Sequence, residues 1–238
     1  MPAAIVTGAS SGIGLAISHA LAEEGHELTV CARRPDKLEA AVAALRRAGH
    51  PVESVAANVA DEDAVRQVVD VHRERYGRLD VLVNCAGFGF GAAVADIPTK
   101  RADQQLGVNL RAPILFYREC ANLLRAAGAE HGNALVVNVA SLSGKSAQPW
   151  LSVYSATKAG LIAFTEAMNK ELGADGVKSV AFAPGWVDTP MADFVKERVK
   201  PEEMIRTEDI AEAVRFLLRL SPYCVVPEIV FQRRSEWL

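Results

Sequence analysis

Short apolar segments alternate with longer amphipathic segments along the whole chain. The short segments have the length of strands and are apolar on both faces, which is typical of strands buried inside a parallel sheet. The longer segments repeat apolar residues every three to four positions, which predicts helices. The expected strands span residues 3–7, 27–32, 52–57, 80–83, 134–139, 177–183 and 225–231. The expected helices span residues 12–24, 99–106, 109–127, 152–172 and 207–218, with two more beginning near residues 35 and 61.

Regular alternation of strands and helices predicts a doubly wound α/β fold, a single and mostly parallel sheet with helices on both faces. Residues of the types that end helices stand at the expected boundaries. Gly25 is expected to end the first helix, Asp61 to cap the third and Thr207 to cap the last. The sequence contains no tandem repeat and no linker, so we expect one domain over residues 1–238.

Composition narrows the class of protein. Half of the 238 residues are apolar, 23% are charged and the formal net charge is −3, which excludes a disordered chain and gives no general attraction to nucleic acid or anionic membranes. No apolar run approaches the roughly 18 residues of a membrane span, and the N-terminus does not resemble a signal peptide. Of the four cysteines, Cys31, Cys85, Cys120 and Cys224, the three in apolar stretches (Cys31, Cys85 and Cys224) are interpreted as reduced and buried. These features predict a cytoplasmic enzyme with no nucleic-acid or membrane partner.

A glycine-rich turn follows the first strand, in the order Thr7-Gly8-Ala9-Ser10-Ser11-Gly12-Ile13-Gly14. Glycines allow a backbone to turn sharply and to approach a pyrophosphate closely, and the helix that starts here offers free N–H groups. The spacing is G-x-x-x-G-x-G rather than G-x-G-x-x-G, so the turn alone is also consistent with a tight strand–helix connection.

Further motifs follow in a fixed order, and together they resemble the short-chain dehydrogenase/reductase family over nearly the whole chain. They are the loop just described, Asn84-Cys85-Ala86-Gly87, Asn109, Ser141, Tyr154-x-x-x-Lys158, and Pro184-Gly185-x-x-x-Thr189. The resemblance implies a Rossmann-type fold, a nicotinamide cofactor and interconversion of a carbonyl and a secondary alcohol by hydride transfer. The same fold also supports a second hypothesis, a non-catalytic NADP-binding regulatory or scaffold protein.

The resemblance implies four catalytic residues, Asn109, Ser141, Tyr154 and Lys158. Tyr154 and Lys158 are four positions apart on an expected helix, so their side chains share one face. Tyr154 is expected to donate the proton, and a neighbouring cation such as Lys158 lowers a phenol pKa. Ser141 follows a strand and is expected to polarise the carbonyl, with Ser143 as a rival hydroxyl. The resemblance assigns Asn109 to a bound water. No histidine or carboxylate cluster indicates a Ser-His-Asp triad or a metal site.

Arginine at the end of the second strand favours NADP over NAD. Ala32 stands where NAD-binding chains place an acid, and Arg33 and Arg34 follow it, suited to a 2′-phosphate. Asn58-Val59 replaces the aspartate–aliphatic pair usual in the family, although we expect the adenine contact to persist. The expected cofactor-binding residues are Gly8, Ser10, Ser11, Gly12, Ile13, Gly14, Arg33, Arg34, Asn58, Val59, Asn84, Ala86, Gly87, Tyr154, Lys158, Pro184, Gly185, Val187 and Thr189.

Apolar and aromatic residues near the expected site predict a lipophilic substrate, for instance a 3-oxoacyl compound or another ketone. The expected substrate pocket comprises Phe88, Phe90, Leu142, Ser143, Trp150, Trp186, Met191 and Phe194. Residues 189–206 are expected to form a lid. Apolar residues on the 152–172 helix, together with the family's two-helix interface, predict a homodimer. A homotetramer is the alternative, although the chain lacks the family's usual V-D-G-G ending.

Overall fold

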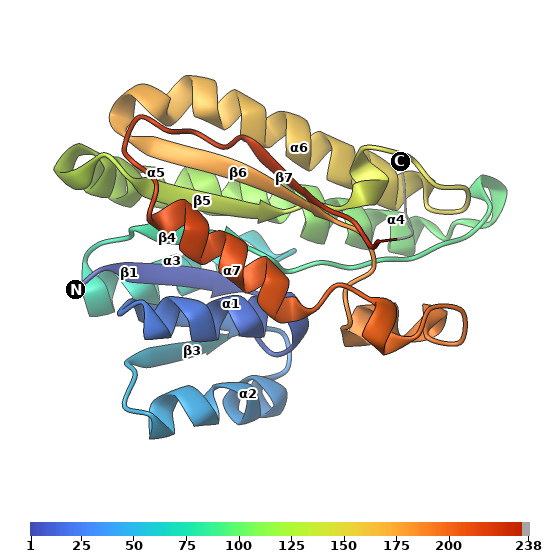
Figure 1. Cartoon of the computed structure of the whole chain (residues 1–238), viewed down its shortest axis with the longest axis horizontal. Helices are drawn as coiled ribbons and strands as arrows, with labels where there is room; N and C mark the ends of the chain where they lie inside the picture. The colour runs from blue at the N-terminus through green and yellow to red at the C-terminus, as the bar shows by residue number, and fades with distance from the viewer. Residues whose placement is uncertain (235–238) are drawn as a thin grey trace.

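One parallel sheet organises the molecule (Figure 1). Within residues 1–234, which the computed structural model describes, seven strands pair in the order β3-β2-β1-β4-β5-β6-β7. Every pairing is parallel. The strands are β1 (Ala3–Thr7), β2 (Glu27–Ala32), β3 (Val52–Ala56), β4 (Val81–Asn84), β5 (Ala134–Val139), β6 (Val177–Pro184) and β7 (Glu228–Phe231). The predicted doubly wound α/β fold is confirmed.

Helices cover both faces of the sheet. They are α1 (Gly12–Glu23), α2 (Pro35–Arg47), α3 (Glu62–Tyr76), α4 (Thr99–Leu106), α5 (Ala112–His131), α6 (Ser152–Leu172) and α7 (Thr207–Leu218). Helices α1, α2 and α7 pack on one face, where α1 and α7 lie next to each other (Figure 1). Helices α3, α5 and α6 pack on the other.

Two apolar cores explain why the strands are apolar on both faces. In β1, Val6 belongs to the core under α1, α2 and α7, whereas its neighbour Ile5 belongs to the core under α3, α5 and α6. Both side chains are fully buried. Successive side chains of a strand point to opposite faces, so a strand covered on both sides needs apolar residues at every position.

The two helices predicted around residue 108 are one continuous helical stretch. A single π-helical turn, Gly107–Arg111, joins α4 to α5 with helical backbone at both junctions. Asn109 lies inside this turn instead of starting a separate helix. Such turns widen the helix locally and are frequent at functional sites.

Two of the three predicted helix ends are confirmed. Asp61 caps α3, because its carboxylate accepts a hydrogen bond from the N–H of Asp63 at 3.1 Å. Gly25, with φ of +86°, follows the C-cap residue Glu24, and its N–H donates to Ala22 O in the last turn of α1 at 3.0 Å. The prediction for Thr207 was wrong: Thr207 is the first residue of α7, and the Asp209 carboxylate instead accepts from the N–H of Arg206 at 3.1 Å.

The last strand is shorter than predicted. It begins at Glu228 and not at residue 225, and it is preceded by a turn in which the N–H of Cys224 donates to Ser221 O at 3.0 Å. Cys224 is exposed, which corrects the expectation that it is buried. Cys31 and Cys120 are buried, and Cys85 is half-buried.

Metal-binding clusters and membrane-spanning helices are both absent from residues 1–234. No group of three or more histidine, cysteine or acidic residues is arranged there to hold a metal ion. None of the helices in this range combines the length and the apolar character that crossing a bilayer requires.

Candidate active site

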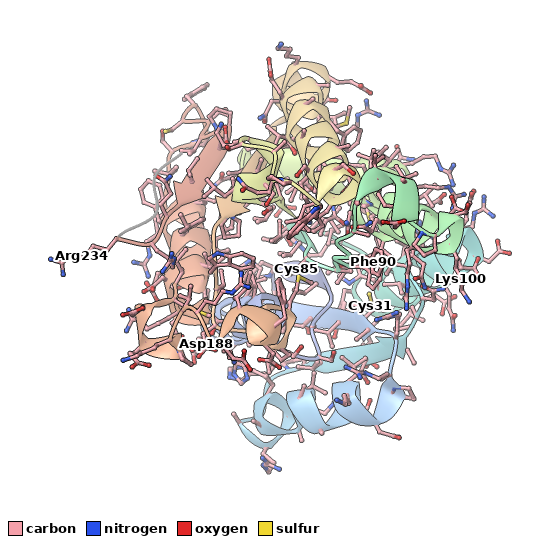
Figure 2. The ribbon with its side chains drawn as sticks, turned by 90° about the vertical axis from the view of Figure 1, so that its right-hand side faces the viewer. Cys31, Cys85, Phe90, Lys100, Asp188 and Arg234 are labelled. Atoms are coloured by element: carbon pink, nitrogen blue, oxygen red, sulfur yellow. The ribbon has the colours of Figure 1, made fainter. Side chains whose placement is uncertain are left out.

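A cavity of about 830 Å³ opens at the carboxyl ends of the strands. It lies where the strand order reverses, since β1 pairs with both β2 and β4 and the chain leaves β1 and β4 in different directions. This crevice is where open α/β sheets bind ligands. Figure 2 looks onto this edge of the molecule, with Cys85 and Phe90 near the centre of the view, and both residues line the cavity.

The glycine loop forms one end of the cavity, and its glycines are required by geometry. A Cβ on Gly8 would lie 2.9 Å from the backbone of Ala86, and one on Gly14 would lie 2.6 Å from Gly8 O. Gly12 has a left-handed φ of +56°, and a Cβ there would lie 2.9 Å from the Thr189 side chain. The side chain of Ser11, which precedes α1, makes no capping hydrogen bond. The first amides of α1 therefore remain available to an anion.

Two arginines line the cavity beyond the glycine loop. Arg33 and Arg34 are exposed, and neither makes an ion pair with any carboxylate in the described part of the chain. Val59 and Ala57 line the wall after β3. These features fit a phosphorylated dinucleotide such as NADP. The amides of α1 and the glycine loop suit its phosphates, the two arginines suit a further phosphate, and the apolar wall at Ala57 and Val59 suits a base.

Ser141 and Tyr154 both line the cavity. Ser141 follows β5, and its Oγ accepts a hydrogen bond from the N–H of Ser143 at 3.1 Å. Burial raises the pKa of Tyr154 overall, and the neighbouring Ser141 hydroxyl lowers it by a smaller amount. Close packing of the Ser141 loop on α6 requires Gly144, where a Cβ would lie 2.7 Å from the backbone of Lys158.

Lys158 lies one helical turn after Tyr154, as the spacing predicts. Its ammonium lies 5.7 Å from the centre of the Tyr154 ring and donates to Val139 O at 2.7 Å. The side chain is almost fully buried, and this burial lowers its pKa to about 8. The influence of Lys158 on the Tyr154 pKa stays a prediction, because burial and Ser141 account for the shift in that group.

Asn109 holds the backbone of the segment that follows β4. Its Oδ1 accepts from the N–H of Phe88 at 2.8 Å, and its Nδ2 donates to Phe88 O at 2.9 Å. Nδ2 also donates to Thr157 Oγ1 on α6 at 3.2 Å. The amide thus links the π turn, the segment carrying Phe88 and the helix carrying Tyr154. Its expected contact with a water stays a prediction.

Most predicted site residues line this one cavity. Those that do are Gly8, Ser10, Ser11, Gly12, Ile13, Gly14, Arg33, Arg34, Val59, Ala86, Gly87, Phe88, Phe90, Ser141, Leu142, Ser143, Tyr154, Lys158, Pro184, Gly185, Trp186, Val187, Thr189, Met191 and Phe194. Four predicted residues, Asn58, Asn84, Asn109 and Trp150, are absent from its wall.

Local hydrogen bonds explain where two of these side chains lie, and the roles predicted for all four residues stay predictions. Asn58 is exposed, and its Oδ1 accepts from the N–H of Ala60 at 3.4 Å, so the side chain folds into its own turn. Asn84 is buried between strands, where its Nδ2 donates to Asn138 Oδ1 at 2.8 Å. Trp150 is 72% exposed to solvent.

Several lining residues were missed from the sequence. Cys85, Gly91, Ser146, Gln148 and Leu151 line the cavity. The last three belong to the connection between Ser141 and α6, which carries no motif. A Pro149-centred turn is the only signal there, and it predicts a bend without saying which side chains face a ligand.

The expected lid segment is folded against the cavity. Pro190–Val195 forms a short 3₁₀ turn, and the rings of Trp186 and Phe194 meet edge to face at 5.6 Å. Lys196 forms ion pairs with Asp188 at 2.9 Å and Asp193 at 2.8 Å. These ion pairs connect Lys196 to neighbouring parts of the same segment. The mobility of residues 189–206 stays a prediction.

Comparison with known proteins agrees with this geometry. The family model described as short chain dehydrogenase matches residues 2–200. The chain therefore belongs to the short-chain dehydrogenase family, and it is an oxidoreductase with a Rossmann-type fold.

Solved structures similar to this chain include three oxidoreductases with nicotinamide cofactors. An alcohol dehydrogenase from Thermococcus sibiricus, complexed with 5-hydroxy-NADP, is 29% identical with a TM-score of 0.89, over 100% of this chain and 99% of that one. A variant of actinorhodin polyketide ketoreductase with NADPH is 33% identical with a TM-score of 0.86, over 97% and 94%. A 3-ketoacyl-(acyl-carrier-protein) reductase from Brucella melitensis, complexed with NADH, is 26% identical with a TM-score of 0.87, over 97% and 95%.

Proposed function

We propose that this protein is an NADP-dependent carbonyl reductase that acts on a lipophilic ketone, of which a 3-oxoacyl compound is one example. The observation that carries the proposal is that Ser141, Tyr154 and the buried ammonium of Lys158 line one cavity, with the ammonium 5.7 Å from the Tyr154 ring, and that this cavity suits a phosphorylated dinucleotide. NADPH, when bound, supplies a hydride to the carbonyl carbon.

The chain's own side chains handle the oxygen and the proton. Ser143 N–H donates to Ser141 Oγ, so the Ser141 proton is free to be donated to the substrate oxygen and to stabilise the charge that develops there. Burial raises the pKa of Tyr154, which keeps its hydroxyl protonated at neutral pH. Tyr154 then donates this proton to the same oxygen, which becomes the alcohol.

Lys158 and Asn109 have supporting roles in this proposal. The Lys158 cation lies close enough to stabilise the phenolate that Tyr154 leaves behind. Asn109 holds Phe88 and Thr157 in register, and in this way sets the distance between the segment after β4 and the catalytic helix. The water relay through Asn109, implied by the family resemblance, is part of the same proposal.

The preference for NADP rests on Arg33 and Arg34. The overall fold does not decide the cofactor, because similar structures contain NADPH in one case and NADH in another. A guanidinium that has no carboxylate partner among residues 1–234, placed after β2, supplies the charge that a 2′-phosphate requires.

A homodimer and a lid complete the proposal. Leu106 and Ile114, on the continuous helix of α4 and α5, are 46% and 40% exposed, which supports a symmetric contact there. The apolar excess predicted on α6 is smaller than expected, because Leu161 and Thr165 are buried within the subunit. Residues 189–206 act in this proposal as a lid over the substrate.

A substrate screen tests the proposal. NADPH consumption would be followed with ketone esters, acyl thioesters, steroids and quinones, using Tyr154→Phe as the matched inactive variant. We expect turnover on at least one lipophilic class, reduced about 10²- to 10⁴-fold in Tyr154→Phe. Cofactor binding without turnover on any class would support the regulatory alternative instead. Undiminished turnover in Tyr154→Phe would remove the tyrosine from the mechanism.

A further inference from the structure

A tight turn directly before α6 carries a tryptophan where a glycine is normally found. The N–H of Leu151 donates to Gln148 O at 3.1 Å, which closes a four-residue turn with Pro149 and Trp150 at its centre. Trp150 has φ of +63°. Proline at the second position and a left-handed third position define a type II turn, and the third position of that turn favours glycine or asparagine.

Trp150 is conformationally unfavourable at this position. Among residues 1–234 it is the only residue other than glycine with positive φ. A left-handed backbone costs free energy for any residue with a Cβ, and most of all for a bulky one. The indole does not recover this cost by burial, because the residue is 72% exposed. Neither local propensity nor core packing explains a tryptophan here, and such conflicts concentrate at functional positions.

The turn forms part of the substrate end of the cavity. Gln148 and Leu151, on either side of its centre, both line the cavity. Trp150 O accepts from the N–H of Ala92 at 2.8 Å, which attaches the turn to the segment after β4. A Cβ on Gly91 would lie 3.2 Å from Trp150 O, so the two segments touch.

The segment held by the turn is also aromatic on its cavity side. Phe88 and Phe90 line the cavity and precede Ala92. The backbone of Phe90 is fixed as well, because its N–H donates to Gln105 Oε1 at 3.1 Å. The turn that carries Trp150 therefore lies next to the aromatic part of the cavity wall, on a backbone fixed by its own turn and by Ala92.

We propose that Trp150 is a specificity-determining residue that covers the outer part of a bulky, planar and largely apolar ketone. This inference rests on the proposed function and adds a substrate class to it. A ketone with one ring would be held between Ser141, Tyr154 and the inner wall. A fused second ring would extend to the rim and stack against the indole.

The experiment compares α-tetralone, a bicyclic ketone, with cyclohexanone, its single-ring counterpart, using NADPH. The variants are Trp150→Gly, which removes the indole and suits the left-handed backbone, and Trp150→Phe, which keeps an aromatic ring. Tyr223→Ala is the control, since Tyr223 is 98% exposed and does not line the cavity. We expect Trp150→Gly to lower the ratio of kcat/KM for α-tetralone over cyclohexanone about tenfold, mainly through KM. Trp150→Phe and Tyr223→Ala should keep the ratio within about threefold.

The melting temperature separates specificity from structure. Glycine fits the third position of the turn, so Trp150→Gly should melt at the same temperature as the wild type or higher. An unchanged substrate ratio would overturn the inference, and so would a lower melting temperature together with equal losses on both ketones. A change of oligomeric mass without a change of ratio would make Trp150 an interface residue. Absence of turnover on both ketones, and on every class of the broader screen, would instead contradict the proposed function.

Discussion

The ammonium of Lys158 donates a 2.7 Å hydrogen bond to the carbonyl oxygen of Val139, and this bond connects α6 to the end of β5. It holds a cation inside the cavity wall next to Tyr154. The cost of this placement is visible in the lysine itself, because burial lowers its pKa from 10.5 to about 8, against a smaller opposing effect of Cys85.

The buried lysine makes stability depend on pH. Between pH 8 and pH 10.5 the unfolded chain keeps the lysine proton that the folded chain has lost, so folding stability rises with pH in this window. Below about pH 8 both states are protonated and the cost of burying the charge is fully present. We expect the Lys158 contribution to change by about 2 kcal/mol between pH 7 and pH 9.5.

Urea unfolding gives the free energy of unfolding of the wild type and of Lys158→Met at pH 7 and pH 9.5. The Lys158 contribution is the change with pH in the wild type minus the change with pH in the variant. Lys37→Met, on an exposed part of α2, serves as the control and should follow the wild type. Identical pH dependence in the wild type and in Lys158→Met would contradict the prediction.

Removing Arg33 should narrow the preference between the two cofactors. In Arg33→Ala, NADPH affinity should fall about ten- to a hundredfold, because a charge-assisted pair contributes roughly 1.5 to 3 kcal/mol, while NADH affinity should change little. Calorimetric titration of both cofactors checks this. Arg47→Ala is a suitable control, since Arg47 is exposed at the end of α2 and does not line the cavity. Equal affinities for NADPH and NADH in the wild type would refute the role of Arg33.

The glycine loop allows backbone strain to be separated from ligand binding. Gly12→Ala introduces a Cβ at φ of +56° and at 2.9 Å from Thr189, so it should lower both stability and NADPH affinity, the latter by more than about tenfold. Gly25→Ala introduces the same kind of strain at φ of +86°, but beyond the other end of α1, where no other atom lies within 4 Å of the added Cβ.

Thermal melting and cofactor titration of the two alanine variants should therefore diverge. Both should lose stability, by about 1 kcal/mol for the strain alone, and only Gly12→Ala should lose affinity. An equal loss of NADPH affinity in Gly25→Ala would show that backbone strain beyond the far end of α1 is sufficient, and that the contact of the glycine loop with the cofactor is not specific.

Association through α5 is testable by mass. Light scattering should give the mass of two chains, or of four. Ile114→Asp should shift it toward one chain, because a charge would be buried in the contact. Val94→Asp changes a side chain that is 80% exposed outside α4 and α5, and should leave the mass unchanged. A wild-type protein with the mass of a single chain would end this proposal.

Local patterns were sufficient for the sheet and the helices, whereas the choice of Ser141, Tyr154 and Lys158 as the centre of the site also required the resemblance to the short-chain dehydrogenase/reductase family. Strands apolar at every position, as in β1, predict a parallel sheet covered on both faces, and the spacing of Tyr154 and Lys158 on a helix predicts a shared face. The position of Ser141 at the end of β5 is likewise local information, because the carboxyl ends of parallel strands meet at one edge. These inferences need only periodicity and chain order, which sequence alone contains.

Contacts between distant segments were not predictable in the same way. That Asn109 binds the backbone of Phe88 and that Asn84 binds Asn138 depends on which strand and helix become neighbours. The burial that lowers the Lys158 pKa depends on the same packing. The turn at Trp150 shows most clearly what the sequence does not predict. Pro149 predicts a bend, but only the folded chain shows that Trp150 is left-handed and that its turn lies beside the cavity. Tertiary structure decides these features because a side chain's partners and solvent exposure come from residues far away in the chain, and no local pattern records them.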